Sequence, residues 1–287
     1  MSEGSPDFEA ELPVRVHAPE RRTSRLVFAS PHSGRNYPDA FLALVRLPLA
    51  LLRRSEDAYV DELIAAAPAC GASLVEADFP RTWVDANRAR WEFDPAMFDG
   101  PLPPEAGPAT ARAAAGLGVV PRLAADGRAI YGGPIAFEEA RRRVERGYVP
   151  YHQAVKREIE RACETWGEAV LIDCHSMPSA SARGADIVLG DRFGASCSEA
   201  VVTRAERGFR DLGFSVVRNR PYAGGYTTEH YGRPSAGVHV LQVEINRGLY
   251  LEEAAVERSA RFEAAQAAFS RWIQWMTLED EVQAAAE

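Results

Sequence analysis

The sequence predicts an α/β protein with a mostly parallel sheet, folded as one domain. Short apolar runs typical of buried strands alternate along the chain with longer stretches of helical apolar spacing. Strands that alternate with helices are typical of parallel sheets, because a helix usually joins consecutive parallel strands. The chain of 287 residues shows no internal repeat and is long enough to bury one large core or two small ones.

The predicted elements cover a core from about 24 to 276, between tails at 1–23 and 277–287. Residues 91–134 are rich in proline and glycine, and we expect them to form a long excursion over the surface of the same domain. Before the core, the opening residues are expected to be a tail or an edge segment. In chain order we expect a strand at 25–30, a helix from about 55 to 70, strands at 72–79, 169–174, 185–190, 214–217 and 238–245, helices at 137–166 (with a break near Pro150), 196–212 and 251–276, and a loop at 218–233.

Composition narrows the class of protein. A net charge of −8 gives no general electrostatic reason to expect a nucleic-acid partner. The four cysteines are widely spaced without a CxxC pair, which argues against a cysteine-rich zinc module and a disulfide scaffold. No apolar run approaches the roughly 18 residues of a membrane span, and the polar, acidic start is unlike a signal peptide. We therefore expect a cytoplasmic protein without nucleic-acid or membrane partners.

Three polar residues lie at or near the ends of predicted strands. His32 follows the strand at 25–30, His175 follows the strand at 169–174, and Glu244 is near the end of the strand at 238–245. Ligands of open α/β sheets bind beyond the carboxyl ends of the strands, so these residues can converge although they are far apart in sequence. Each also has a structural interpretation: a histidine after a strand is often a hydrogen-bonded structural residue, and Glu244 could face solvent.

A carboxylate near the start of the predicted helix at 55–70 could join this group. Asp57 falls on the same side as Val60 and Ile64, so it should point inward. It could also be a favourable charge at a helix N-terminus, and Glu56 could be the inward residue instead. Two histidines and a carboxylate are a common ligand set for catalytic zinc, and a second carboxylate beside the water would serve as general base.

The remaining histidines and cysteines contribute less. His17 and His152 are expected at the surface. Cys174 is adjacent to His175, but neighbouring strand residues point to opposite faces, so the two should not form a catalytic pair. A buried, inert thiol is the expected role of Cys174.

Five motifs, in order, resemble those of the N-formylglutamate amidohydrolases. They are "SPHSGRNYP", "SEDAYVDEL", "FPRTWVDANR", "LIDCHSMP" and "GGYTTEHYGRP…GVHVLQVEINR", and the resemblance runs from about 25 to 250. It implies a zinc carboxypeptidase-like fold, related also to the aspartoacylase group: a three-layer α/β/α domain with a central mixed, mostly parallel sheet. It also implies hydrolysis of a linear amide, N-formyl-L-glutamate to formate and L-glutamate, as in one route of histidine breakdown.

The resemblance also assigns roles to residues of this sequence. It implies one zinc ion bound by His32, Asp57 and His175, with Glu244 activating the zinc-bound water. The family's position within "SED" favours Asp57 over Glu56. Where Ala86 stands, the family more often has a larger apolar residue. The implied contacts to a small anionic acyl amino acid are Asn87 and Arg88, with Arg81, His230, Tyr231 and Arg233 as further candidates.

Three functions therefore compete at this point. The first is deformylation of N-formylglutamate, and the second is hydrolysis of another acyl amino acid or a short peptide by the same zinc chemistry. A non-catalytic binding protein for acidic metabolites is the third. The sequence leaves open the native metal, whether the chain forms a homo-oligomer, and whether 91–134 covers the site as a lid.

Overall fold

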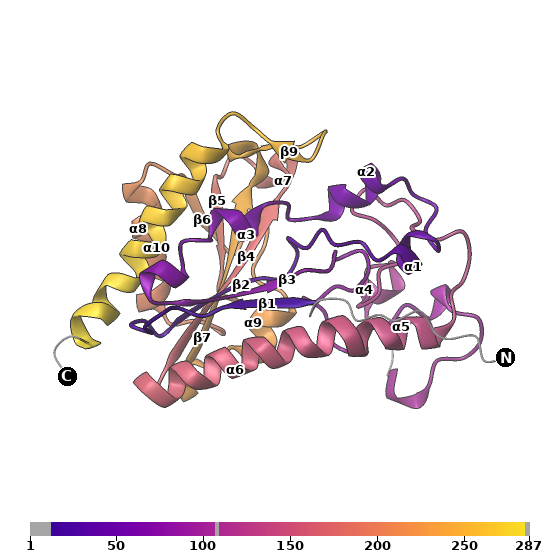
Figure 1. Cartoon of the computed structure of the whole chain (residues 1–287), viewed down its shortest axis with the longest axis horizontal. Coiled ribbons are helices and arrows are strands. Elements are labelled where there is room, and N and C mark those ends of the chain that lie inside the picture. Colours follow the sequence, from indigo (N-terminus) through magenta and orange to yellow (C-terminus); the bar gives the residue numbers. More distant parts are fainter. Residues whose placement is uncertain (1–12, 107–108, 285–287) are drawn as a thin grey trace.

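A seven-stranded sheet forms the centre of the molecule (Figure 1). The computed structural model describes residues 13–106 and 109–284. The strand order across the sheet is β1-β3-β2-β4-β7-β5-β6. The strands are β1 (Val14–His17), β2 (Leu26–Ser30), β3 (Ser73–Ala77), β4 (Ala169–Met177), β5 (Ile187–Gly190), β6 (Val216–Arg218) and β7 (Val238–Asn246). The adjacent strands β3, β2, β4 and β7 are parallel to one another, and β5 is parallel to β6. Two pairs are antiparallel: β1 with β3, and β5 with β7. The predicted mixed, mostly parallel sheet is confirmed.

Helices cover both faces of this sheet. The helices are α1 (Asp39–Leu42), α2 (Leu49–Leu52), α3 (Val60–Leu63), α4 (Ala111–Ala114), α5 (Phe137–Arg143), α6 (Val149–Trp166), α7 (Ser179–Ala182), α8 (Glu199–Asp211), α9 (Tyr226–Tyr231) and α10 (Phe262–Ala284). In Figure 1, α8 and α10 lie side by side on one side of the sheet, while α5 and α6 run along the other. The three-layer α/β/α arrangement is confirmed.

Each face has its own hydrophobic core. On what we call the closed face, apolar side chains of β2, β4 and β7 pack with those of α3, α8 and α10. On the opposite face, which we call the site face, the first residues of β4 and β7 pack with α6 and with side chains of the excursion at 91–134. A side chain's position along a strand therefore decides its face and what covers it.

Several predicted elements differ from the observed ones. The helix expected from 55 is only the single turn α3, because Tyr59 adopts a left-handed backbone (φ 62°) that interrupts helical geometry before Val60. The break expected near Pro150 is instead a π-helical turn at Val144–Tyr148, and Pro150 lies in the first turn of α6, where its missing N–H is tolerated.

The ends of the predicted core also shift. The strand expected at 169–174 continues to Met177, so His175 lies within β4. A short hairpin, β8 (Leu251–Glu252) with β9 (Glu257–Arg258), occupies the start of the predicted closing helix, and α10 runs on to Ala284. The predicted N-terminal tail contains the edge strand β1, while 1–12 and 285–287 lie outside the described residues.

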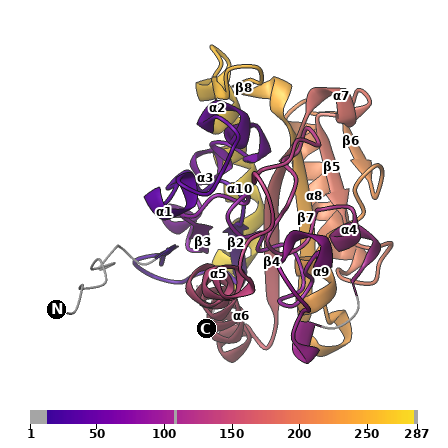
Figure 2. The ribbon, with the colours of Figure 1, turned by 90° about the vertical axis from the view of Figure 1, so that its right-hand side faces the viewer.

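The excursion at 91–134 consists of turns and short helices, among them α4, rather than long periodic elements. In Figure 2, α4 and α9 lie close together in projection, and side chains of both line one groove. Within the described part of the chain, no helix combines the length and apolar character needed to cross a membrane.

Candidate metal centre

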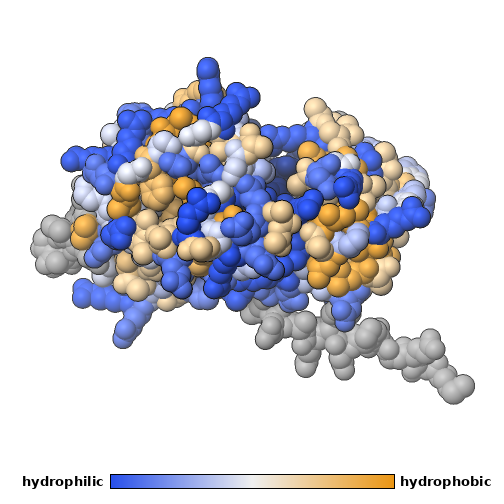
Figure 3. Space-filling view, turned by 90° about the horizontal axis from the view of Figure 1, so that it is seen from above, coloured by the Kyte–Doolittle hydropathy of each residue, from blue (hydrophilic) through white to orange (hydrophobic). Residues whose placement is uncertain are grey.

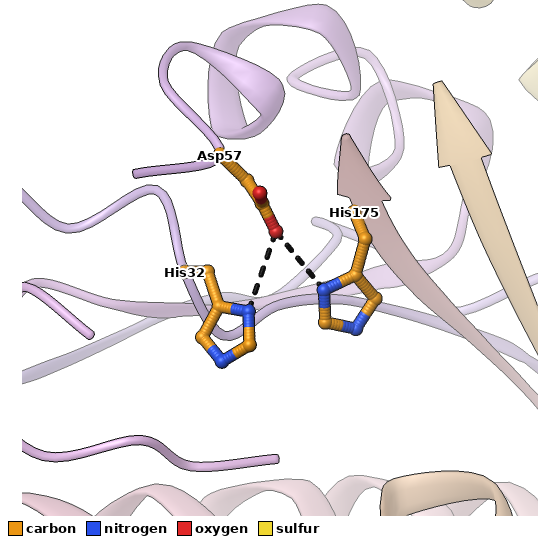
Figure 4. Close-up of side chains that lie close together, drawn as sticks. All are labelled: His32, Asp57 and His175. Carbon is orange, nitrogen blue, oxygen red and sulfur yellow. Dashed lines mark hydrogen bonds and ion pairs between the residues drawn. The ribbon is translucent and has the colours of Figure 1, made fainter. Parts of the chain in front are cut away.

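Two histidines and a carboxylate meet at the carboxyl ends of the central strands (Figure 4). Asp57 Oδ2 lies 3.3 Å from His32 Nδ1 and 3.0 Å from His175 Nδ1. One potential ligand atom from each of the three residues lies within 4.8 Å of the other two, and all three side chains are buried. The structure thus brings together three residues that lie up to 143 positions apart in the sequence.

Neighbouring elements bring these residues together. His32 comes two residues after β2, and His175 lies near the end of β4, which pairs directly with β2. Asp57 comes from the turn before α3, and its backbone N–H donates to the carbonyl of His32 at 3.0 Å. Asp57 is therefore placed by this turn rather than by the helical face that its spacing suggested.

The outer nitrogen of each histidine faces another buried carboxylate. His32 Nε2 lies 2.7 Å from Asp85 Oδ1, and His175 Nε2 lies 3.0 Å from Asp173 Oδ2. A bound cation would replace the protons between the two Nδ1 atoms and Asp57 Oδ2, and each neutral ring would then present its Nδ1 lone pair to the ion. Three acceptor atoms facing one another repel unless a proton or a cation lies between them. This donor set fits a cation, and carboxylates behind the histidines are typical of metal sites.

The second oxygen of Asp57 is held from behind. Asp57 Oδ1 accepts from Arg247 Nη2 at 3.1 Å and from Ser176 Oγ at 3.3 Å. Burial acts to raise the pKa of Asp57, but the hydrogen bonds from His175 and His32 outweigh it and hold the pKa well below its ordinary value. Asp57 is thus ionised, with Oδ2 left to face the histidines.

Glu56 points away from the histidines. Its Oε1 accepts from Tyr37 Oη at 2.8 Å and from Arg53 Nε at 3.3 Å. Arg247 Nη2 donates to the backbone carbonyl of Glu56 at 2.6 Å, which anchors the turn between the two acidic residues. Of the two carboxylates that the sequence left open, only that of Asp57 faces the histidine pair.

Glu244 lies beside His175 on the next strand. The two residues are partners in the β4–β7 register, so their side chains share the site face. Burial raises the pKa of Glu244 to about 7, with the attraction of His175 opposing the shift and the charge of Asp57 adding to it. A carboxyl group that titrates near neutral pH can accept and release a proton under physiological conditions.

A side-chain amide orients Glu244. Gln242 Nε2 donates to Glu244 Oε1 at 2.8 Å, and Gln242 Oε1 accepts from the backbone N–H of Gly225 at 2.8 Å. Gln242 therefore links the carboxyl group to the segment that begins α9.

The predicted substrate-binding residues Arg81, Asn87 and Arg88 border this centre. Arg81 Nη2 donates to Asp85 Oδ2 at 2.9 Å, and its Nη1 lies 4.0 Å from Asp57 Oδ1. Asn87 Nδ2 lies 3.3 Å from His175 Nε2. Arg88 donates to the carbonyls of Leu117 and Asn87. A cavity of about 200 Å³ lies against Arg81, Asp85 and Arg88.

A larger groove, of about 600 Å³, begins at Asn87 and runs along α9. His230 and Arg233 line it, whereas Tyr231 does not. Tyr231 instead donates from its hydroxyl to His152 Nδ1 at 2.8 Å, against α6. Seen from above, the surface is hollowed between two more hydrophobic flanks, and hydrophilic side chains surround the hollow (Figure 3).

Sequence reasoning missed three residues of this region and misplaced one. Asp85 and Arg247 were not singled out, although each lies inside a motif noted for its neighbours, and Arg192, which lines the groove, was not considered. His152, expected at the surface, is largely covered, and its Nε2 donates to the carbonyl of Ala86 at 2.9 Å.

Cys174 lies on the closed face in the hydrophobic core, where burial raises the pKa of its thiol well above the ordinary value. A buried thiol with a raised pKa carries little thiolate, so it is a poor nucleophile.

The chain resembles known proteins over most of its length. Residues 24–251 match the sequence model of a family described as N-formylglutamate amidohydrolase. The chain is 32% identical over 239 residues to an N-formylglutamate deformylase of Pseudomonas putida, a match that covers 79% of this chain and 82% of that protein. It is also 32% identical over 239 residues to an N-formylglutamate deformylase of Pseudomonas aeruginosa, covering 80% of this chain and 83% of that one.

Solved structures share the fold. The crystal structure of N-formylglutamate amidohydrolase from Ralstonia eutropha JMP134 superposes with a TM-score of 0.89 at 33% identity, covering 95% of this chain and all of that one. A protein from Agrobacterium tumefaciens superposes with a TM-score of 0.64 at 17% identity, covering 96% of this chain and 97% of that one.

Proposed function

The chain belongs to the N-formylglutamate amidohydrolase family, and from this premise we propose that it hydrolyses the amide bond of N-formyl-L-glutamate, releasing formate and L-glutamate. The convergence of His32 Nδ1, His175 Nδ1 and Asp57 Oδ2, beside the buried carboxyl group of Glu244, is the observation that carries the proposal. An amide bond is too stable to be cleaved without both electrophilic activation and proton transfer, and these residues are suited to supply both.

We propose that His32, Asp57 and His175 hold one divalent ion, and that this ion is zinc. Two imidazoles with a carboxylate are a common protein ligand set of catalytic zinc sites, which keep a further position open. Zinc in such a site acts as a Lewis acid towards a carbonyl group and lowers the pKa of water to about 7. Asp85 would orient His32, the charge of Asp173 would lie beside His175, and Arg247 would orient Asp57.

Glu244 is the proposed general base and acid. In its ionised form it takes a proton from the water that attacks the formyl carbon, and it then delivers that proton to the leaving amine nitrogen. Glu244 is placed for both transfers, because it is the register partner of His175 and shares the site face with it. Gln242, by donating to Oε1, keeps the carboxyl group in a fixed orientation.

Arginines and an amide are proposed to hold the amino acid part of the substrate. Arg81, Asn87 and Arg88 border the metal centre, where the carboxylate next to the scissile amide would lie. Guanidinium groups bind carboxylates with two parallel hydrogen bonds, so they both fix and orient the substrate. His230 and Arg233, further along the groove, are proposed additional contacts, and Tyr231 would support them from behind.

The test compares metal content and turnover. Purified protein should contain about one zinc per chain and should hydrolyse N-formyl-L-glutamate faster than N-acetyl- or N-succinyl-L-glutamate. Glu244→Gln should lower kcat by about 10²- to 10⁴-fold while the zinc content stays unchanged, because it removes only the proton transfer. Faster turnover of the acetyl or succinyl compound would assign another acyl group. A folded, metal-free protein without activity would contradict the hydrolase itself.

A further inference from the structure

The groove that leads away from the metal centre is rich in arginine. Arg88, Arg112, Arg192 and Arg233 line it, together with Glu92 and Glu229. Its inner end is part of the metal centre, because Asn87 contacts His175 and Gly225 donates to Gln242. A Cβ atom at Gly225 would lie 2.4 Å from Asn87 Nδ2, so only glycine allows the two walls to approach so closely.

Two of these four arginines use part of their guanidinium group to bind backbone carbonyls. Arg88 donates to the carbonyls of Leu117 and Asn87, and Arg233 donates to the carbonyls of Glu229 and Gly232. Arg192 Nη1 instead donates to Glu229 Oε2 at 3.3 Å, and Glu229 is an exposed side chain. An exposed ion pair of this kind contributes little stability, so another carboxylate can replace Glu229 readily.

The backbone that carries Arg192 is strained and firmly held. Arg192 (φ 53°), Phe193 (φ 56°) and Gly194 (φ 87°) form three consecutive left-handed residues, a conformation that is unfavourable for the first two. Asn219 Oδ1 accepts from the backbone N–H groups of Asp191 and Phe193, and the N–H of Arg192 donates to Ala223 O at 2.8 Å. Strained residues that their surroundings hold in place concentrate at ligand-binding sites.

We propose that Arg192 binds the side-chain carboxylate of the acyl amino acid, and that it thereby selects acidic over neutral substrates. This inference rests on the proposed function and extends it. The carboxylate next to the amide is held near the metal centre, and the second carboxylate extends along the groove to Arg192, where it displaces Glu229. The rigid turn keeps the guanidinium over the groove before the substrate arrives, which reduces the ordering cost of binding.

The test measures the preference for N-formyl-L-glutamate over N-formyl-L-glutamine. Arg192→Met should lower kcat/KM for formylglutamate by about 10- to 100-fold, the usual worth of a charge-assisted bidentate contact. It should change kcat/KM for formylglutamine by less than about two-fold, because that substrate brings no second charge. Arg192→Lys should keep part of the preference, and Arg112→Met, from the same groove, should keep all of it.

The outcomes separate this inference from the proposed function. If wild type prefers formylglutamate and Arg192→Met, folded by thermal unfolding, keeps the same preference, the role of Arg192 is refuted while the deformylase stands. If wild type turns over neither substrate, the deformylase is refuted, and calorimetric binding of L-glutamate against L-glutamine decides about Arg192. A preference for glutamate that Arg192→Met abolishes supports the role, and an unchanged preference refutes it.

Discussion

The two faces of β4 and β7 share a backbone but differ in chemistry. Along the closed face the buried side chains are mostly apolar: Val170, Ile172 and Cys174 of β4, and Leu241, Val243 and Ile245 of β7, with Ser176 and His239 as polar exceptions near the strand ends. Along the site face the strands begin apolar, with Leu171 and Val240, and then turn polar, with Asp173, His175, Gln242 and Glu244.

The covering of each face explains this difference. Regular helices cover the closed face, so apolar side chains fill most of it. On the site face, irregular segments such as the one carrying Asp85, and the short helix α9, meet the ends of the strands. Irregular backbone brings carboxylates and amides to buried groups in positions that a helix spanning the sheet would fill with apolar residues. Buried polar groups are tolerated there because partners reach them.

The largest expected effect on stability comes from placing a charged side chain on the closed face. Val243 is fully buried on the closed face, so Val243→Asp would bury an unpaired charge and should lower the free energy of unfolding by about 4 kcal/mol or more. Glu244→Gln, one residue along the strand, should change it by less than about 1 kcal/mol at pH 5, because the amide can keep a hydrogen bond to Gln242. Urea unfolding measures both. Equal losses would mean that the two faces do not differ as described.

The free energy of unfolding, measured over a range of pH, should show the cost of burying the ionised form of Glu244 on the site face. The pKa of Glu244 is raised to about 7 in the folded protein, above the value of about 4.3 in an unfolded chain. The folded state therefore holds this proton more tightly, and the contribution of Glu244 to stability falls as pH rises from about 4.3 to about 7. In metal-free protein, the unfolding free energy of wild type should drop relative to Glu244→Gln by up to about 3 kcal/mol over this range. A difference that stays constant with pH would show that burial does not perturb Glu244.

Asp85 tests whether the irregular segment supports the metal centre. Asp85→Asn keeps the shape of the side chain but removes the charge behind His32, so zinc affinity should fall by about 10- to 100-fold. Competition with a chromophoric chelator measures it. Asp126→Asn, which removes an outlying carboxylate of the excursion that pairs with Arg128, is the control and should leave the affinity unchanged. Equal zinc affinities in wild type, Asp85→Asn and Asp126→Asn would show that Asp85 does not support metal binding.

The smallest effect concerns the strained turn beside the groove. Phe193 is 73% exposed and left-handed, so Phe193→Gly should raise the free energy of unfolding by about 0.5–1 kcal/mol. Phe193→Ala removes the same ring but keeps a Cβ atom, so its free energy of unfolding should rise little above that of wild type. Chemical denaturation of the two variants side by side distinguishes relief of backbone strain from loss of the exposed ring. A gain of equal size in both would argue against strain.

The sequence predicts the regular parts of this molecule better than the irregular ones. The predicted strands placed His32, His175 and Glu244 at or near their carboxyl ends, where ligands of open α/β sheets bind. Helical spacing placed Asp57 on a helix that the left-handed Tyr59 prevents. Positive φ at a tyrosine has no recognisable sequence signal, so this difference could not be foreseen.

Contacts between residues far apart in the sequence could not be predicted either. His152 appears exposed when α6 is considered alone, but Tyr231, 79 positions later, covers it. Asp85 and Arg192 lie in segments without a period, where sequence spacing says nothing about direction. The polar partners of the site therefore had to be found in three dimensions, whereas the strand residues they support could be named from the sequence.

The central claim is that one metal ion joins His32, Asp57 and His175 beside Glu244. Anomalous diffraction from crystals of the zinc-loaded protein, recorded at the zinc absorption edge, tests it most directly. We expect one strong peak about 2.0–2.2 Å from His32 Nδ1, His175 Nδ1 and an oxygen of Asp57, with Glu244 near the ion but not among its ligands. A peak at other residues, or none at this cluster, would contradict it.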